Sequence, residues 1–282
     1  MHKFILPLFY LGGFLISAHA TIFVQESFLT TDYTADTNVV GQNGGTGFSG
    51  NWSSGDVFAP TVRFDTRSTG LSYSGWSNEG GSLEHYRTNS SSFTKTITHN
   101  LNYSAPTISG SDVAYFGFLF NATAGVRFDL SWNGTSSRNN VFTYAGNTTE
   151  EMVFNGGGSA STELRVAAAA GQDHLVLLRI SDNTTYDFEE YYDNIEMWVD
   201  PDLSNLGVAD DTGRGIFSKF GGGNTDLAAD DWSITATLTE GQSFKVDELF
   251  FSNDLIAIPE PSSALLFLTG VAVSLISLRR KR

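Results

Sequence analysis

The sequence predicts an all-β protein, and three observations favour this fold class. Short stretches alternate strictly between apolar and polar residues, which is typical of strands with one buried face and one solvent-facing face. The 282 residues include 22 Phe, 10 Tyr, 5 Trp and 29 Gly, so residues that suit pleated sheets accompany residues that suit tight turns. Long Ala, Leu, Glu and Lys stretches with a helical period are missing. We therefore expect one antiparallel sandwich or barrel in the body of the chain.

The first element is a leader. Lys3 is followed by an apolar run from Phe4 to Ile16, and then by Ala18, His19 and Ala20. A basic start, a short apolar segment and small residues at a cleavage site are typical of a secretory signal. The apolar run is shorter than the roughly 20 residues that a membrane-spanning helix needs. We expect a signal peptide over residues 1–20, cleaved after Ala20.

The body then reads as a series of strands separated by Gly, Asn and Ser turns. The clearest stretch is "VRFDLSW", with Val126, Phe128, Leu130 and Trp132 on one face. Its opposite face carries Arg127, Asp129 and Ser131. By the same criterion we expect strands at 93–99, 113–120, 126–132, 163–168, 174–180, 194–199, 232–239 and 244–251.

The last element is a tail. An uncharged segment from Ser262 to Leu278 has 17 residues, at the lower limit of about 17–25 for spanning a bilayer. Four basic residues follow it: Arg279, Arg280, Lys281 and Arg282. Basic residues stay on the cytoplasmic side, which matches a body that has already been exported. The pattern predicts a short transmembrane helix.

This ending resembles a known sorting signal. Pro259, Glu260 and Pro261, followed by the apolar segment and the basic cluster, resemble the PEP-CTERM signal of bacterial surface proteins. The resemblance covers residues 259–282. It implies that the inner membrane holds the precursor transiently, and that an exosortase-like membrane enzyme cuts near the motif and passes the protein to the cell surface or the extracellular matrix.

The body resembles a known fold as well. "ESFLTTDYTADTNVVGQNGGTGFSGNW", "HLVLLRISDNTTYDFEEYYDNIEMWVDPDLSNLG" and "FKVDELFFSND" resemble segments of concanavalin A-like, laminin-G-like sandwiches that are often joined to PEP-CTERM tails. The resemblance implies an antiparallel two-sheet jelly roll over residues 21–258. It implies no activity by itself.

Charge and cysteine content exclude several classes of function. Without the leader and the tail, the body has 11 basic and 30 acidic residues, so nucleic acid is not an expected partner. The absence of cysteine excludes disulfides, thiolate metal sites and cysteine nucleophiles.

Few residues of the body match a catalytic motif. The nearest approach to a glycosidase motif is Glu190, Asp193 and Glu196. Residues three apart on a strand point to opposite faces, so this spacing does not form the close carboxylate pair of a retaining glycosidase. No catalytic residue is assigned, and a glycoside hydrolase stays an alternative.

Four aspartates offer a metal hypothesis. Asp200, Asp202, Asp210 and Asp211 could supply oxygen ligands to Ca²⁺, although the ordered EF-hand pattern is absent. A solvated acidic edge is the favoured interpretation, so no cofactor is required and Ca²⁺ stays open.

Aromatic residues and threonines suggest surfaces for a ligand. Trp52 and Trp76 lie in Gly- and Ser-rich surroundings, which makes them the candidates for exposed rings that could stack on sugars, although structural packing is the favoured role for each. Two threonine ladders, Thr94-x-Thr96-x-Thr98 and Thr235-x-Thr237-x-Thr239, resemble the rows of ice-binding faces. No internal repeat accompanies them, so the polar side of an ordinary strand accounts for them.

These observations lead to one expected function and two alternatives. We expect an exported, non-catalytic protein of the cell surface or extracellular matrix that could bind exopolysaccharide. The alternatives are a glycoside hydrolase of the concanavalin A-like fold and a purely structural surface protein.

Overall fold

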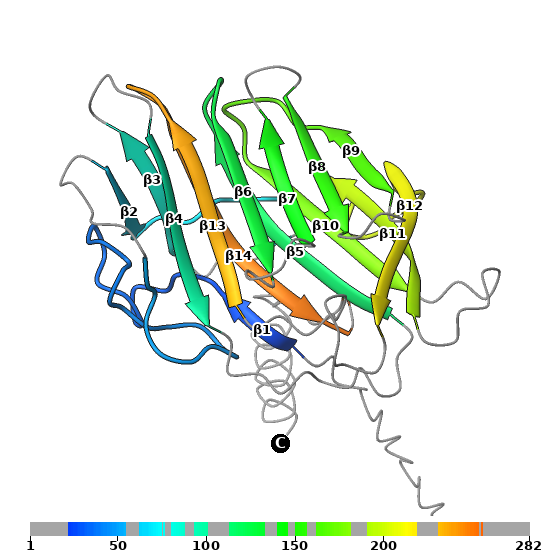
Figure 1. Cartoon of the computed structure of the whole chain (residues 1–282), viewed down its shortest axis with the longest axis horizontal. Helices are drawn as coiled ribbons and strands as arrows, with labels where there is room; N and C mark the ends of the chain where they lie inside the picture. Colours follow the sequence, from blue (N-terminus) through cyan, green and yellow to red (C-terminus); the bar gives the residue numbers. More distant parts are fainter. Residues whose placement is uncertain are drawn as a thin grey trace, which may run out of the picture.

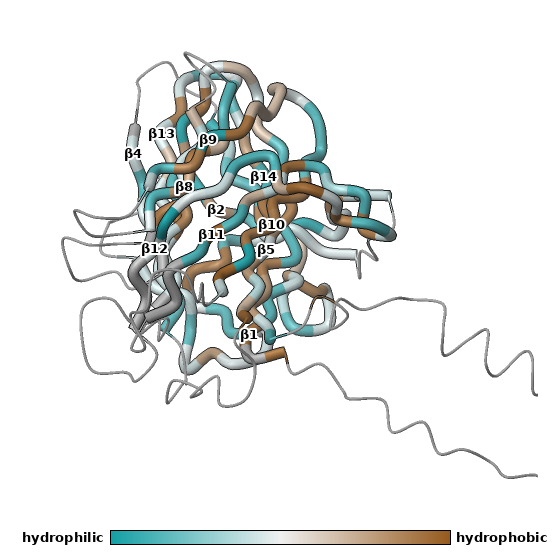
Figure 2. Tube along the Cα trace, turned by 90° about the vertical axis from the view of Figure 1, so that its right-hand side faces the viewer, coloured by the Kyte–Doolittle hydropathy of each residue, from teal (hydrophilic) through white to brown (hydrophobic). Residues whose placement is uncertain are grey.

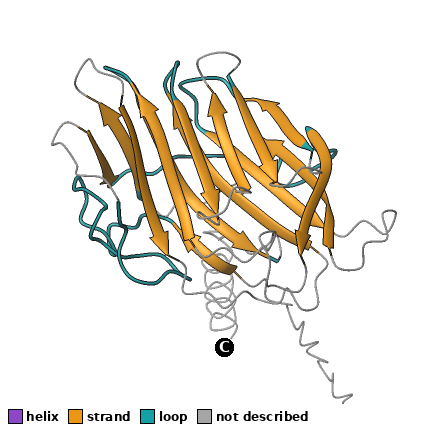
Figure 3. Ribbon diagram, in the orientation of Figure 1, coloured by secondary structure: helices purple, strands orange, loops and turns teal. Residues whose placement is uncertain are grey.

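The computed structural model describes residues 22–54, 62–74, 76, 80–87, 93–100, 113–132, 140–145, 150–156, 162–181, 191–218, 231–253 and 255. These residues form strands, turns and loops arranged as two facing antiparallel sheets (Figure 1, Figure 3). The strands are β1 (Ile22–Glu26), β2 (Val62–Arg67), β3 (Ser82–Arg87), β4 (Phe93–Asn100), β5 (Val113–Ala122), β6 (Arg127–Trp132), β7 (Asn140–Ala145), β8 (Glu151–Gly156), β9 (Glu163–Ala167), β10 (His174–Ser181), β11 (Tyr191–Val199), β12 (Asp211–Ser218), β13 (Asp231–Leu238) and β14 (Ser243–Ser252). The all-β sandwich predicted from the sequence is confirmed.

The eight strand ranges expected from the alternation are also confirmed, each within three residues of its observed ends, as β4, β5, β6, β9, β10, β11, β13 and β14. The leader, 1–20, and the tail, 259–282, with Ala18, Ala20, the Pro259-Glu260-Pro261 motif and the terminal basic cluster, lie outside the described residues. Within the described ranges, no helix has both the length and the apolar character that crossing a membrane needs.

The larger sheet has eight strands in the order β12-β11-β10-β5-β14-β3-β2, with β1 paired to β14. The two halves of β14 have different partners on one side: β3 pairs with its first half and β1 with its second half. Between the halves, Glu248 adopts a φ of 49° at an irregularity in the pairing with β5. A bulge of this kind changes the course of a strand, which lets one long strand serve two neighbours.

The smaller sheet has six strands in the order β4-β13-β6-β7-β8-β9. In Figure 1 this sheet lies in front of the larger one. Its second strand, β13, pairs with the edge strand β4 on one side and with β6 on the other, in regular register. Because that register is regular, residues of these three strands that share a row also share a face.

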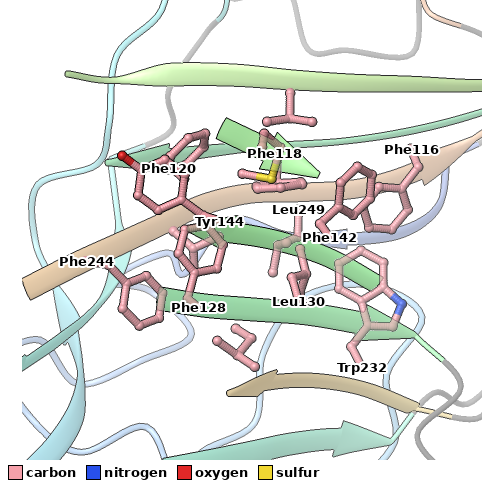
Figure 4. Close-up of a cluster of buried hydrophobic side chains, with 14 of the residues drawn as sticks. Phe116, Phe118, Phe120, Phe128, Leu130, Phe142, Tyr144, Trp232, Phe244 and Leu249 are labelled. Carbon is pink, nitrogen blue, oxygen red and sulfur yellow. The ribbon is translucent and has the colours of Figure 1, made fainter. Parts of the chain in front are cut away.

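Phenylalanine dominates the core between the sheets (Figure 4). Alternate residues of β5 point inward, and the ring centroid of Phe116 lies 5.3 Å from that of Phe142 on β7. The Phe128 and Phe244 rings are stacked with centroids 5.0 Å apart. The brown, apolar stretches of β5 and β10 mark the same interior in the turned view (Figure 2). Rings that interlock in this way hold the two sheets in one relative position.

A second apolar cluster lies on the opposite side of the larger sheet. It contains Leu71, Trp76, Leu119, Leu175, Leu177, Trp198 and Phe250. Gly117 makes room for it, because a Cβ atom there would lie 2.3 Å from the Phe250 ring. Part of the outer face of the larger sheet is therefore covered. The outer face of the smaller sheet differs, and the candidate site lies there.

Candidate functional site

The outer face of β4, β13 and β6 is a surface of hydroxyl groups. Inward residues of these strands, such as Ile97, Ile234 and Leu130, are buried in the core. The next residue on each strand points outward, so the alternation that builds the core also builds the polar face. The sequence pattern predicts this face directly.

The hydroxyl groups are paired across the strands. The Oγ1 atoms of Thr94 and Thr237 are 2.8 Å apart, and those of Thr96 and Thr235 are also 2.8 Å apart. A hydroxyl has one hydrogen to donate and two lone pairs to accept with. Each threonine pair therefore keeps one hydrogen and most of its lone pairs for a ligand, while the pairing fixes both side chains.

This face contains an open depression of about 480 Å³. It is lined by Thr94, Gly125, Arg127, Asp129, Thr235, Thr237, Thr239 and Gln242. The lining combines hydroxyl groups with one guanidinium and one carboxylate. It offers both donors and acceptors, and it lies mainly on sheet strands, which form a rigid support.

Arg127 and Asp129 form the charged part of the depression. Both lie on β6, two residues apart, so they point to the same side. Arg127 Nη2 lies 3.8 Å from Asp129 Oδ1, and their side chains are 59% and 30% exposed. The Thr143 hydroxyl donates a 2.6 Å hydrogen bond to the same Asp129 oxygen. Thr143 of β7 thus holds the Asp129 carboxylate in place. The Arg127 guanidinium forms a long and exposed ion pair, so it keeps hydrogen-bond donors free for a ligand.

Two turns close one end of the depression. Gln242 Nε2 donates to the Ala124 carbonyl at 3.1 Å, and Gln242 Oε1 accepts from Thr239 N at 2.7 Å. The turn between β13 and β14 is therefore attached to the turn between β5 and β6. Gly125 is needed at this contact, because its φ is +81° and a Cβ atom would lie 2.5 Å from Gln242 Nε2.

A separate network of ionisable groups lies beneath the loop formed by residues 27–54. Tyr33 Oη donates a 2.5 Å hydrogen bond to Glu26 Oε2, and Trp52 Nε1 donates to Tyr33 Oη at 3.1 Å. His99 Nδ1 lies 3.8 Å from the same carboxylate oxygen, and both side chains are fully buried. Burial raises the pKa of Glu26 to about 7 and lowers that of His99 to about 4.

Strongly shifted pKa values often mark functional sites, but structural networks produce them too. Here the groups hold one another and pack in an aromatic stack. The His99 ring lies 4.2 Å from the Phe48 ring and 4.6 Å from the Trp52 ring, measured between centroids. Within the part of the chain that the structure describes, Glu26 is fully buried. We assign it to the stability of the loop.

Trp52 and Trp76, the candidates for stacking on a sugar, are both buried, so that hypothesis is corrected and the packing role is favoured. Trp52 is 1% exposed and Trp76 is 7% exposed. Trp52 lies in the buried network, and Trp76 packs on Phe250 with ring centroids 5.2 Å apart. Trp52 belongs to the core cluster and Trp76 to the apolar cluster on the outer face of the larger sheet. Neither ring can stack on a sugar in this conformation.

The four aspartates of the Ca²⁺ hypothesis each bind neighbouring protein groups. Asp200 accepts from Leu175 N at 3.0 Å and pairs with His174 Nδ1 at 2.6 Å. The other three accept from backbone N–H groups: Asp202 from Ser204, Asp210 from Val199, and Asp211 from Arg165 and Thr212. In the part of the chain that the structure describes, no three His, Cys, Asp or Glu side chains form a group that could hold a metal ion. Ca²⁺ binding stays a prediction.

Glu196, from the weak glycosidase motif, lies in an ion pair with Arg179, whose Nε donates to Glu196 Oε2 at 2.5 Å. Glu190 lies outside the described residues, and the side chain of Asp193 is not described.

Sequence reasoning named the threonine ladders but assigned them no role, and it did not select Arg127 or Asp129. The signal was present in "VRFDLSW", which places both residues on the polar face. What the sequence did not contain was the pairing of β6 with β13, which brings these charges beside the threonines.

No protein-family model matches the chain, and no curated protein matches it either. Among solved structures it is similar to the globular domain of T. cruzi calreticulin, with 9% identity, a TM-score of 0.47, and coverage of 91% of this chain and 99% of that chain. It is also similar to Bacillus licheniformis β-glucanase, with 12% identity, a TM-score of 0.39, and coverage of 83% and 98%. A third similar structure is the binding domain of botulinum neurotoxin DC in complex with rat synaptotagmin II, with 9% identity, a TM-score of 0.39, and coverage of 70% and 46%.

Proposed function

We propose that this protein is a non-catalytic glycan-binding protein of the bacterial cell surface or extracellular matrix. The observation that carries the proposal is the open, hydroxyl-lined depression on the outer face of the smaller sheet. Glycan chains present many hydroxyl groups that both donate and accept. A rigid surface of hydroxyls, with one guanidinium and one carboxylate, complements that chemistry.

The lining also supports a binding role over a hydrolytic one. A retaining glycosidase uses two carboxyl groups about 5–5.5 Å apart, and an inverting one uses two that are about 6.5–9.5 Å apart. Asp129 is the one carboxylate among the eight lining residues. Glu26, whose raised pKa would suit an acid catalyst, lies buried beneath the loop and not in this depression.

Export and surface delivery are part of the proposal and rest on the two ends of the sequence. The leader with Ala18 and Ala20 would direct export. The Pro259-Glu260-Pro261 motif, the apolar segment and the basic cluster would hold the precursor in the inner membrane for an exosortase-like enzyme. Deletion of residues 259–282 in a host with such an enzyme should abolish membrane retention and processing. Unchanged retention and processing would contradict this part of the proposal.

A polysaccharide pull-down tests the binding function. We expect the protein to be retained on polysaccharide without release of reducing sugar, and Arg127→Ala to reduce retention about five- to tenfold because a charged donor is lost. Arg165→Ala is the matched control, because Arg165 is 54% exposed and ion-paired on the outer face of the same sheet but outside the depression.

Release of reducing sugar would favour the glycoside hydrolase alternative. Absence of retention would favour a purely structural protein. A parallel assay with chelator tests whether Ca²⁺ contributes.

A further inference from the structure

We infer that the depression selects neutral glycan chains, and that Asp129 is the residue that excludes polyanionic ones. The inference rests on the proposed function and names the class of glycan that the site would take. Its basis is the balance of charge inside and around the depression.

The charges inside the depression cancel. Arg127 and Asp129 are the only charged residues among the eight that line it, and their charged atoms are 3.8 Å apart. The remaining lining residues are Thr94, Gly125, Thr235, Thr237, Thr239 and Gln242, all of them uncharged. A polyuronate or a sulfated chain would find one guanidinium and, next to it, a carboxylate that repels it.

The net charge of the protein adds further repulsion. The chain has a net charge of −15, and most of its acidic residues belong to the body. A polyanion approaching the depression moves against this field, which extends about 10 Å at 0.1 M salt. A neutral chain experiences neither the local nor the long-range repulsion.

Asp129 occupies its position independently of Arg127. The Thr143 hydroxyl binds it at 2.6 Å from the neighbouring strand, and both residues lie in regular strand pairing. A ligand that engages the Arg127 guanidinium therefore does not displace the carboxylate. Asp129 would stay beside any bound chain and act on its charge.

The same sheet face provides an internal control. Glu151 on β8 pairs with Arg165 on β9, so it is also an outward carboxylate beside an arginine. Its side chain is 28% exposed, close to the 30% of Asp129. It lies outside the depression. Removing its charge changes the net charge of the protein by the same amount as removing that of Asp129.

The test compares the full-length protein with Asp129→Asn and Glu151→Gln. The probes are two neutral polymers, β-1,3-glucan and hydroxyethyl cellulose, and two polyuronates, alginate and polygalacturonate, at low and high salt. We expect the unmodified protein to prefer the neutral polymers. Asp129→Asn should bind the polyuronates about fivefold more tightly at low salt, which corresponds to an exposed charge pair of up to ~1 kcal/mol. Because Asp129 lines the depression and can accept hydrogen bonds from a neutral chain as well, the quantity compared is the ratio of polyuronate binding to neutral-polymer binding, which should rise at least about fivefold.

Three outcomes overturn the inference, and they differ in what else they overturn. If the unmodified protein prefers polyuronates, the inference is wrong and glycan binding stands. The same conclusion follows if Glu151→Gln raises polyuronate binding as much as Asp129→Asn, because the effect would then come from net charge alone. If none of the four polymers is retained, both the inference and the proposed function fail. Thermal unfolding of each variant verifies that the fold is intact.

Discussion

The sandwich has two sides along which an edge strand of one sheet faces an edge strand of the other, and these two sides are closed in different ways. At one side, β9 of the smaller sheet meets β12 of the larger sheet directly (Figure 1). Thr162 N donates to the Arg214 carbonyl at 2.7 Å, and Arg214 N donates to the Thr162 hydroxyl at 3.0 Å. These two hydrogen bonds involve only two residues, and three of the four groups that form them belong to the backbone.

At the other side, the loop of residues 27–54 forms hydrogen bonds with both edge strands, β2 of the larger sheet and β4 of the smaller sheet. Val39 N donates to the Phe64 carbonyl of β2 at 2.8 Å. Ser53 and Thr98 of β4 exchange two backbone hydrogen bonds of 2.8 Å each. The loop thus pairs with the outer edge of each sheet, which satisfies strand edges that would otherwise be exposed.

The difference between the two sides shows where stability has to come from. Ordering a long loop costs about 1–2 kcal/mol of backbone entropy per residue, so the loop must bury side chains to be stable. It does so through Phe28, Tyr33, Val39 and Trp52, all of them 3% exposed or less. We therefore expect the stability of the side covered by residues 27–54 (the loop-closed side) to be sensitive to mutation and to pH. The stability of the side where β9 meets β12 (the strand-closed side) should be sensitive to neither.

The largest expected effect comes from Trp52→Ala. The ring is 1% exposed, lies between the Phe28 and His99 rings, and binds Tyr33. Its removal leaves a cavity beneath the loop and should lower the free energy of unfolding by about 3–5 kcal/mol. Denaturant unfolding measures this, with Trp52→Phe as a milder control. A loss below about 1 kcal/mol would mean that the loop does not stabilise this side.

Trp52 also shows how far the sequence alone reaches. Regular strands could be predicted because their period matches the burial on each face, as in β6 and β13. The place where Trp52 packs could not, since it depends on the course of an irregular loop that has no sequence period. Six strands were missed: β1, β2, β3, β7, β8 and β12. In β3, buried polar residues such as Ser82 and His85 obscure the alternation, and β1 pairs with β14, near the other end of the described residues.

The candidate site could be predicted from the sequence only in part. The sequence predicts which residues of β4, β6 and β13 face outward, because that follows from the alternation. It does not predict that Arg127 lies beside Thr237, since this depends on a pairing between strands about 100 residues apart. The role of Gln242 in closing the depression is also invisible in the sequence, because it depends on the contact between two turns.

The second largest effect is pH dependence on the loop-closed side. The pKa of Glu26 is raised from 4.5 to about 7, so its protonated form is favoured by folding. Its contribution is fully present below pH 4.5 and is lost as the pH rises through 7, which amounts to roughly 3 kcal/mol at 1.36 kcal/mol per pKa unit. The pKa of His99 is lowered from 6.5 to about 4, so its contribution is present above pH 6.5 and is lost as the pH falls through 4.

The two groups together favour a stability maximum between about pH 4.5 and 6.5. Thermal unfolding from pH 4 to 9 measures it. Relative to the unmodified protein, Glu26→Gln should become progressively more stable as the pH rises from 4.5 to 7, because it has no charge to bury. Asp247, whose pKa burial raises to about 9, acts in the same direction and should preserve part of the decline at higher pH. An unchanged profile in Glu26→Gln would show that Glu26 does not bind a proton on folding.

A smaller effect is expected from Gly81→Ala. Gly81 lies against the beginning of the loop, and a Cβ atom there would lie 1.8 Å from the Phe28 carbonyl oxygen. Because the obstructing atom belongs to the backbone, the loop must shift, at a cost of roughly 1–3 kcal/mol. Gly50→Ala is a control for strain alone, since its φ is +74° and nothing lies within 4 Å of its Cβ position. Equal losses in both variants would contradict a role for close packing at Gly81.

The smallest effect is expected on the strand-closed side. Thr162→Ala removes the hydroxyl that accepts from Arg214 N but leaves the 2.7 Å backbone bond from Thr162 N to the Arg214 carbonyl. Because Thr162 is exposed, water can replace the hydroxyl, and the loss should be less than about 1 kcal/mol and independent of pH between 4 and 9. Thr162→Ser should restore the stability. A loss as large as that of Trp52→Ala, or one that varies with pH as the Glu26 contribution does, would mean that the two sides share one cooperative network. The contrast between a strand-closed and a loop-closed side would then no longer explain where the protein is sensitive.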